Sequence, residues 1–278
     1  FQQMVIENSK KAYESTIAYM KQEGLFDEIE YAIVDVGWIG TIQQSMEDLV
    51  NSYRSEPFHL KGFYFGLYDT PDNMNQNNFN TFYFNSKNGL KRKVMFNNNI
   101  FECLCAANTG MTIGYETKNG ILIPMFSSEK NVNVGYWPIE EQINGVQEFA
   151  KEAVKVDTMS RETSKRDMQI VYKLCKEFMC RPTKREAQEY GRFRFSDDIT
   201  EKNLTSIAIE MTKEEIRKNR LIYYILERMG STEHTKISCW PEGSIVIAGG
   251  RGTRWNQIDC ILLRTIRYIK MSMKKVKK

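Results

Sequence analysis

The sequence predicts an α/β protein with a mixed sheet in its first part and a mainly helical second part. Two observations favour this fold class. Short apolar runs alternate with helical patterns up to about residue 137, whereas from Ile139 onward apolar residues recur at three- and four-residue spacing. We therefore expect an α/β part over residues 1–137 and a mainly helical part over residues 138–278, or one interlocked domain that combines them.

The first elements lead to a strand at residues 30–35. A helical pattern covers residues 2–24 and ends at Gly24. The apolar run that ends at Asp35 predicts a buried strand whose carboxyl end leads into a loop. A helix over residues 41–53 follows, with Thr41 as its expected N-cap. Its apolar face comprises Ile42, Met46, Leu49 and Val50.

The next hundred residues predict further short elements. Strands are expected at 60–68 and 81–85, with an exposed Asn-rich loop at 73–80 between them. Asn88 and Gly89 are typical of a hairpin turn. A helical piece at 98–107 precedes a hairpin of strands 111–116 and 120–124 around a turn at residues 118–120.

The second part predicts a series of helices. Amphipathic faces cover residues 143–153, 168–178 and 258–269. Thr183 with Glu186, and Thr212 with Glu215, have the spacing of capping boxes, and the helix after Thr212 is expected to reach Met229.

Composition excludes several classes of protein. With 41% hydrophobic and 27% charged residues the chain is globular, and no apolar run approaches the roughly 20 residues of a membrane span. A net charge of +4 is too balanced to indicate nucleic-acid binding. Six cysteines without a CxxC pair, and only two histidines, argue against a zinc site.

Composition also predicts a location. Cysteines at apolar helix positions suit a reducing compartment, and no secretory signal is visible, so we expect a cytoplasmic protein. The Lys-rich tail at 270–278 is a solvated helix end or a contact with the inner membrane face. The first residue is Phe1 rather than Met, as in a segment of a longer protein.

The most informative segment is residues 32–43. It combines an apolar strand, the acid Asp35, a loop containing Gly37 and Gly40, and a helix that starts at Thr41. Glycines let backbone amides approach an anion, and a helix N-terminus carries partial positive charge. Asp35 can accept hydrogen bonds from sugar hydroxyls or bind a divalent cation. The alternative is an ordinary strand–turn–helix.

This segment resembles the phosphoribosyltransferase signature. With Asp35 aligned to the second acid of that signature, Gly40 and Thr41 match its closing Gly-Thr pair. More specifically, residues 34–43 resemble the hallmark of bacterial polysaccharide-assembly proteins that carry such a region downstream of a HAD-type hydrolase domain, the glycan phosphoribosyltransferases. Weaker matches over most of the chain are Gly62–Gly66, Phe101-Glu102, Gly114-Tyr115, Gln142 with Gly145, Pro182-Thr183 and Gly191.

The chain departs from the signature in several ways. Val34 stands in place of the first acid, so one contact with the ribose hydroxyls is lost or supplied elsewhere. One helix precedes the signature where nucleotide-salvage enzymes have several strands. Trp38 is foreign to those enzymes and is a candidate cover for the ribose or the acceptor sugar. The chain contains no HAD signature.

The resemblance implies transfer of ribose 5-phosphate from phosphoribosyl pyrophosphate to a lipid-linked glycan acceptor in capsule or O-antigen synthesis. A HAD-type phosphatase domain or protein would then remove the 5-phosphate. Asp35 would be catalytic and bind Mg²⁺, and Glu102 is the candidate general base unless it is simply a solvated helix acid. The donor contacts would come from Gly37, Trp38, Ile39, Gly40, Thr41 and Gln43.

A second glycine-rich stretch covers residues 245–254. A strand, a glycine turn and a helix are expected there, with Arg251 and Arg254 as substrate contacts through a phosphate or a polysaccharide, or as part of an ordinary turn. It lacks the Gly-Lys-Ser/Thr ending of a P-loop. Tyr136, Trp137 and Trp240, beside prolines, are candidates for sugar stacking or for core packing.

Two other functions remain open. A nucleotide-sugar glycosyltransferase would place its diphosphate on the same loop. A non-catalytic scaffold would dock a hydrolase domain or a glycan, and would tolerate the loss of Asp35.

Overall fold

The computed structural model describes residues 2–156, 165–196, 204–218 and 238–276, together with positions 220 and 225. The fold is mixed α/β, as predicted. The chain forms two compact units. Unit 1 comprises Phe1–Ser86 and Ala107–Val132, and unit 2 comprises Lys87–Ala106 and Asn133–Lys278. The segment at 87–106 thus groups with the helical unit although it precedes residue 137 in the sequence.

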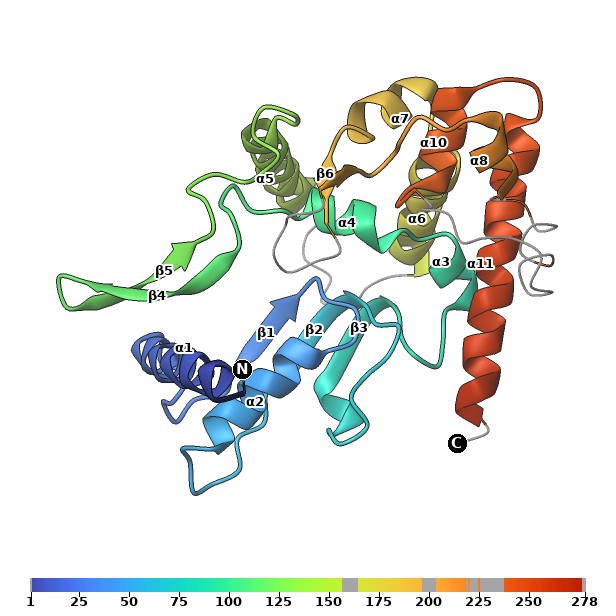
Figure 1. The fold of residues 1–278 in the computed structure, drawn as a ribbon. Coiled ribbons are helices and arrows are strands. Elements are labelled where there is room, and N and C mark those ends of the chain that lie inside the picture. Colours follow the sequence, from blue (N-terminus) through green and yellow to red (C-terminus); the bar gives the residue numbers. More distant parts are fainter. Residues whose placement is uncertain are drawn as a thin grey trace. The chain divides into compact units, whose positions relative to one another are not determined.

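Unit 1 contains a sheet of three strands and a separate hairpin (Figure 1). The strand order is β1-β2-β3, and both pairs are parallel. The hairpin β4–β5 is antiparallel. The expected mixed sheet is therefore wrong, because parallel and antiparallel strands lie in different sheets. The elements are α1 (Gln2–Gln22), β1 (Ala32–Asp35), α2 (Thr41–Asn51), β2 (Lys61–Gly66), η1 (Gln76–Asn78), β3 (Phe79–Phe84), β4 (Thr112–Lys118) and β5 (Ile121–Phe126).

The hairpin of unit 1 confirms its prediction from the turn residues. Asn119 and Gly120, with φ angles of 52° and 82°, provide the two left-handed positions that a tight two-residue turn requires. The hairpin packs against α1, where the rings of Tyr19 and Tyr115 stack with centroids 4.3 Å apart. The side chain of Gln22 donates to the carbonyl of Leu122 and accepts from its amide.

Helix α2 packs against one side of the parallel sheet, and a hydrophobic core of unit 1 lies between them. That core contains the buried residues Val50, Phe58 and Leu60, with Phe26, Tyr31, Ile33 and Met46 packed against them. The expectation that β1 is buried is wrong, because Val34 is 89% exposed. Strand β1 lies at the edge of the sheet, and its residues alternate between the α2 side and an uncovered face of the unit.

Unit 2 is mainly helical, as expected. Its core surrounds Trp240, which is fully buried and donates its indole N–H to the carbonyl of Met179 at 2.8 Å. The elements are α3 (Leu90–Val94), α4 (Asn98–Leu104), α5 (Ile139–Val156), α6 (Lys165–Cys175), the π-helical turn η2 (Lys176–Cys180), α7 (Lys184–Tyr190), β6 (Arg194–Phe195), β7 (Thr205–Ser206), α8 (Lys213–Lys218), α10 (Pro241–Ala248) and α11 (Thr253–Val276).

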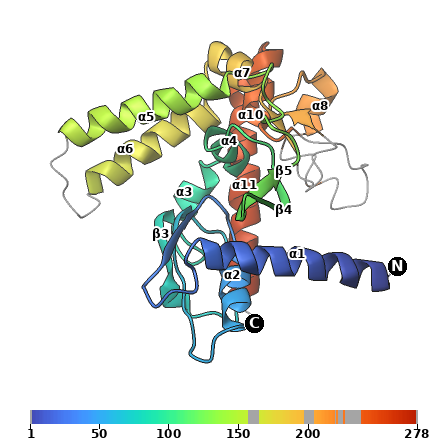
Figure 2. The ribbon, with the colours of Figure 1, turned by 90° about the vertical axis from the view of Figure 1, so that its left-hand side faces the viewer.

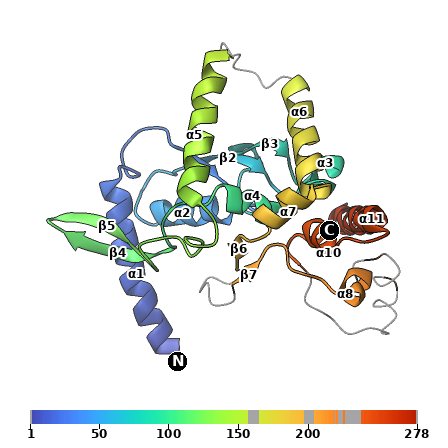
Figure 3. The same cartoon turned by 90° about the horizontal axis from the view of Figure 1, so that it is seen from above.

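Two helices of unit 2 leave apolar side chains exposed. Helices α5 and α6 extend outward in Figures 2 and 3. Phe149 on the predicted apolar face of α5 is 74% exposed, and Leu174 on α6 is also exposed. None of the helices over the described residues combines the length and the apolar character that crossing a bilayer requires.

Local signals in unit 2 are confirmed where they depend on caps. Thr183 and Glu186 form a reciprocal capping box at the start of α7. Thr212 and Glu215 exchange the same pair of hydrogen bonds at the start of α8. Most of the helix expected beyond α8, up to Met229, lies outside the described residues.

Two sequence-based expectations in unit 2 are wrong. Residues 245–248 belong to helix α10 rather than to a strand, because a short apolar run suits either element and this segment packs as a helix against α11. Gly89 does not close a hairpin. Gly89 is instead the N-cap residue of α3, with a left-handed φ of 85°.

Candidate functional site

The candidate donor loop, residues 36–40, lies at the carboxyl end of β1 in unit 1. Asp35, the last residue of β1, is half-buried, and its Oδ1 accepts a hydrogen bond from the amide of Gly37 at 2.7 Å. A Cβ on Gly37 would lie 2.9 Å from Asp35 Oδ2, so a larger residue at this position would displace the carboxylate. One loop amide is therefore already used to orient Asp35.

The loop ends at Gly40, which precedes the first turn of α2. Its φ of 70° is left-handed, and a Cβ there would lie 2.5 Å from Phe79 Cε1. The prediction that Thr41 is the N-cap is wrong. Gly40 occupies that position, Thr41 is the first helical residue, and no side chain caps the helix. The amides of the first turn have no acceptor within the helix, as in any helix N-terminus.

A second loop contacts the first. The carbonyl of Trp38 accepts hydrogen bonds from the amides of Tyr68 at 2.9 Å and Asp69 at 3.4 Å. The rings of Trp38 and Tyr68 also meet, with centroids 5.8 Å apart. Trp38 is half-buried and Ile39 is exposed.

These contacts bring Asp69 to the same edge of the sheet as Asp35. Asp69 is not among the site residues predicted from the sequence. Asp69 follows the end of β2, and neighbouring parallel strands end at one edge, but only the structure shows that β1 and β2 are neighbours. It is a candidate to replace the first acid of the signature, whose position Val34 occupies in this chain.

Gln43 does not face the loop surface. Its side chain is fully buried, its Nε2 donates to the carbonyls of Leu60 and Asn78, and its Oε1 accepts from the hydroxyl of Tyr64 at 2.7 Å. The expected donor contact from Gln43 is therefore corrected to a structural role. Burial, with a smaller effect of the Asp35 charge, raises the pKa of Tyr64, so this hydroxyl stays protonated as a donor.

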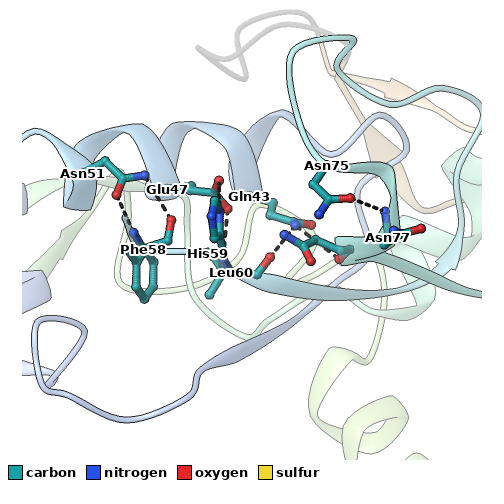
Figure 4. A network of polar contacts seen from close by, with 9 residues as sticks. Gln43, Glu47, Asn51, Phe58, His59, Leu60, Asn75 and Asn77 are labelled. Atoms are coloured by element: carbon teal, nitrogen blue, oxygen red, sulfur yellow. Dashed lines mark hydrogen bonds and ion pairs between the residues drawn. The ribbon is translucent and has the colours of Figure 1, made fainter. Parts of the chain in front are cut away.

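Gln43 belongs to a polar stripe on α2 that Figure 4 shows. Four residues further on, Glu47 accepts from the amide of Leu60 at 2.9 Å and contacts the ring of His59. Asn51, another four residues on, bonds both the amide and the carbonyl of Phe58. The stripe holds α2 against residues 58–60 and so fixes where the helix N-terminus lies relative to β2.

The two loops carry an unusual charge for a phosphate site. Residues 36–40 and 67–78 contain no lysine or arginine but include Asp69 and Asp72. Among the described residues, no three His, Cys, Asp or Glu side chains lie close enough to form a metal site. Asp35 fits the protein part of a Mg²⁺ site, since Mg²⁺ usually binds one or two carboxylates together with substrate phosphates and water.

Other predicted site residues belong to unit 2. Glu102 lies half-buried on α4, and its assignment as general base stays a prediction. Arg251, just before α11, and Arg254, in its first turn, are exposed, and Arg254 lines a cavity that Arg251 does not line. Trp240 is buried in the core, so it is not available for sugar stacking.

The remaining aromatic candidates make contacts within unit 2. The indole N–H of Trp137 donates to Gln142 Oε1 at 2.7 Å, and its ring packs on Tyr190. Tyr136 remains exposed beneath the guanidinium of Arg194, 4.6 Å from its ring centroid. His234, one of the two histidines of the chain, lies outside the described residues.

Comparison of the sequence with protein-family models gives no match, and comparison with curated proteins gives none either.

Proposed function

We propose that unit 1 binds phosphoribosyl pyrophosphate and that the protein transfers ribose 5-phosphate to a glycan hydroxyl. The observation that carries the proposal is the arrangement around Asp35. A carboxylate fixed by the Gly37 amide lies at the carboxyl edge of a parallel sheet, directly before a glycine-closed turn and a helix N-terminus. Open α/β sheets usually bind their ligands at this edge.

The diphosphate would lie against the amides at residues 39–42. The first-turn amides of α2 supply donors and partial positive charge. Because the neighbouring loops hold acids and no basic side chain, neutralising the diphosphate requires a divalent cation. Asp35, with Asp69 as a second carboxylate, would hold Mg²⁺, which supplies charge neutralisation of the leaving pyrophosphate when bound.

The proposed reaction exchanges one C1–O bond for another. The bond from ribose C1 to the pyrophosphate oxygen breaks with its electron pair leaving on pyrophosphate. The acceptor oxygen forms the new bond, and its proton passes to a general base, a role for which the sequence alone suggests Glu102. The protein contributes orientation and stabilisation of charge rather than covalent chemistry.

The proposal extends to the surroundings of the reaction. The acceptor would be a lipid-linked glycan of surface-polysaccharide synthesis, and a HAD-type phosphatase would act on the product. A cytoplasmic protein with its Lys-rich tail at the inner membrane face would reach such an acceptor. The nucleotide-sugar enzyme and the scaffold are the alternatives that the experiment must separate.

Calorimetric and thermal-shift titrations test the donor. At a hundredfold excess over its dissociation constant, phosphoribosyl pyrophosphate with Mg²⁺ should stabilise the protein by about 2.7 kcal/mol. Chelation of Mg²⁺ should abolish binding, and Asp35→Asn should weaken it. Asp48→Asn removes the same charge from an exposed site on α2 and should change nothing.

Each alternative predicts a different result. Binding of UDP- or CDP-sugars in place of phosphoribosyl pyrophosphate would favour the nucleotide-sugar enzyme. Absence of binding by all three, with polysaccharide output intact in Asp35→Ala cells, would favour the scaffold.

A further inference from the structure

Unit 2 contains a cavity of about 390 Å³, a volume typical of small-molecule sites. It lies between the end of η2, helix α10 and the first turns of α11, and α10 and α11 lie side by side in Figure 1. Its apolar lining comprises Val246, Ile258 and Ile261. Four polar side chains also line it: Arg181, Thr253, Arg254 and Gln257.

The two arginines give the cavity a double positive charge. Within the part of the chain that the structure describes, neither Arg181 nor Arg254 forms an ion pair or a side-chain hydrogen bond, and both side chains are exposed. Arginine carries five N–H donors in a planar group that matches phosphate oxygens. The charge is therefore available to an incoming anion.

Gln257 is the second, independent indication of a ligand. It is only 8% exposed, yet its side-chain amide makes no hydrogen bond to any described residue. The amide atoms themselves are not fully buried and reach the open space of the cavity, where water or a ligand can bond them. Because Gln257 lines the cavity, a molecule bound there can satisfy it.

The helix geometry places these groups together. Arg254, Gln257, Ile258 and Ile261 follow one another at spacings of three, one and three residues, which puts them on one side of α11. Helix α11 begins at Thr253, so its N-terminal partial positive charge adds to that of Arg254.

We propose that this cavity binds a phosphate ester with an apolar body. The two guanidiniums match a phosphomonoester, which carries a charge of roughly −1.5 to −2 at neutral pH. The apolar lining accommodates the attached carbon skeleton, and Gln257 donates to or accepts from the ester. This site lies wholly within unit 2 and does not depend on the donor loop of unit 1.

Isothermal titration calorimetry with phenyl phosphate, inorganic phosphate and benzyl alcohol tests the proposal. Phenyl phosphate should bind more tightly than inorganic phosphate because of the apolar lining, and benzyl alcohol should not bind detectably. Arg181→Gln and Arg254→Gln should each weaken binding by about tenfold or more, since each removes charge-assisted hydrogen bonds. Both arginines are exposed, so these variants should fold.

Arg251→Gln is the matched control. Arg251 is exposed, lies three residues before Arg254 and does not line the cavity. Its substitution should leave the affinity within about twofold, as screened surface charges contribute little. An equal loss of affinity in Arg251→Gln and Arg254→Gln would mean general attraction of anions and would overturn the proposal.

Binding to vesicles distinguishes a soluble phosphate ester from a lipid headgroup as the ligand of the cavity. Phosphatidylcholine vesicles with and without phosphatidic acid should show whether binding that requires Arg254 also occurs at a membrane. Arg254-dependent binding of either phenyl phosphate or phosphatidic acid supports the site. Failure of both to bind overturns it, whatever the outcome with phosphoribosyl pyrophosphate.

Discussion

The two glycine loops of this protein, residues 36–40 and 249–252, look alike in sequence but are held in different ways. In the first loop the space beside Gly40 is filled by the ring of Phe79. In the second loop a Cβ on Gly252 would meet no atom within 4 Å, although its φ is 96°. Packing against neighbouring side chains thus constrains the conformation of the first loop. The conformation of the second loop is set by its own backbone and by the flanking helices.

The helices beside the two loops are also anchored differently. Helix α2 is held by the neutral hydrogen bonds of Gln43. Helices α10 and α11 are joined by a buried ion pair in which Arg264 Nη2 donates to Glu242 Oε1. Burial raises the pKa of Glu242, and the adjacent Arg264 opposes that rise by favouring the carboxylate. Similar loop sequences therefore give no information about how the loop is anchored.

Breaking the ion pair should have the largest effect. Glu242→Gln leaves the largely buried Arg264 charge without its carboxylate partner, which typically costs about 3–5 kcal/mol of unfolding free energy. Urea unfolding measures the loss. The double substitution Glu242→Met with Arg264→Met should recover most of it, since well-packed apolar pairs often replace buried ion pairs without loss. A loss below about 1 kcal/mol in the single variant would mean that the pair does not anchor α10.

The glycine loops should differ in their tolerance of a side chain. Gly40→Ala combines left-handed strain with a clash against Phe79 and should cost about 3 kcal/mol. Gly252→Ala introduces only the left-handed backbone strain, without a clash, and should cost about 1–2 kcal/mol of unfolding free energy. Urea unfolding of both variants checks the difference, and equal costs would contradict the contrast between the loops.

Alkaline pH should destabilise unit 2 selectively. All six cysteines belong to unit 2, and burial raises the pKa of Cys180 to about 12. An unfolded thiol ionises near pH 8.5, so the stability from the neutral buried thiol is complete below that pH and is lost as pH rises toward 12. At pH 10 the loss should be about 2 kcal/mol for this thiol.

Hydrogen exchange at pH 8 and pH 10, corrected for the intrinsic rate, locates the loss. Amides of α10 and α11 should lose protection, while those of β2 should keep theirs. Cys180→Ala should reduce the effect of pH on unit 2. Equal loss of protection in both units would refute the assignment to thiols.

Substitution of two buried glutamines should change stability in opposite directions. Gln43→Leu removes three hydrogen bonds and leaves the hydroxyl of Tyr64 without its acceptor, so it should cost about 2 kcal/mol. Gln257→Leu removes an amide that has no partner among the described residues and should stabilise the protein by up to about 1 kcal/mol. Thermal unfolding shows whether each substitution stabilises or destabilises the protein. Destabilisation by Gln257→Leu would contradict the assignment of the Gln257 amide as lacking a hydrogen-bond partner.

Features that depend on residues close in sequence could be predicted from the sequence. Features that depend on packing between distant segments could not. The capping box at Thr183 and the turn at Asn119 depend on residues within a few positions, so each was predicted correctly. The apolar run at Ile245 suits a buried strand or a buried helix equally, and the packing of α10 against α11 decides it.

The candidate site shows the same limit. The position of the loop after Asp35 follows from the local pattern of strand, glycines and helix. The burial of Gln43 depends on Tyr64 and Leu60, which are distant in sequence. Asp69 enters the site through its hydrogen bond to Trp38, and this needs the strand order that no local pattern contains.

Amide NMR of the two loops tests the central claim most directly. On addition of phosphoribosyl pyrophosphate and Mg²⁺, the amide resonances of Ile39, Gly40, Thr41 and Ile42 should shift and exchange more slowly, and chelation should reverse both changes. The amides of Gly250 and Gly252 serve as the internal reference. If the amides at 39–42 stay unchanged at saturating donor, the proposed diphosphate site is contradicted.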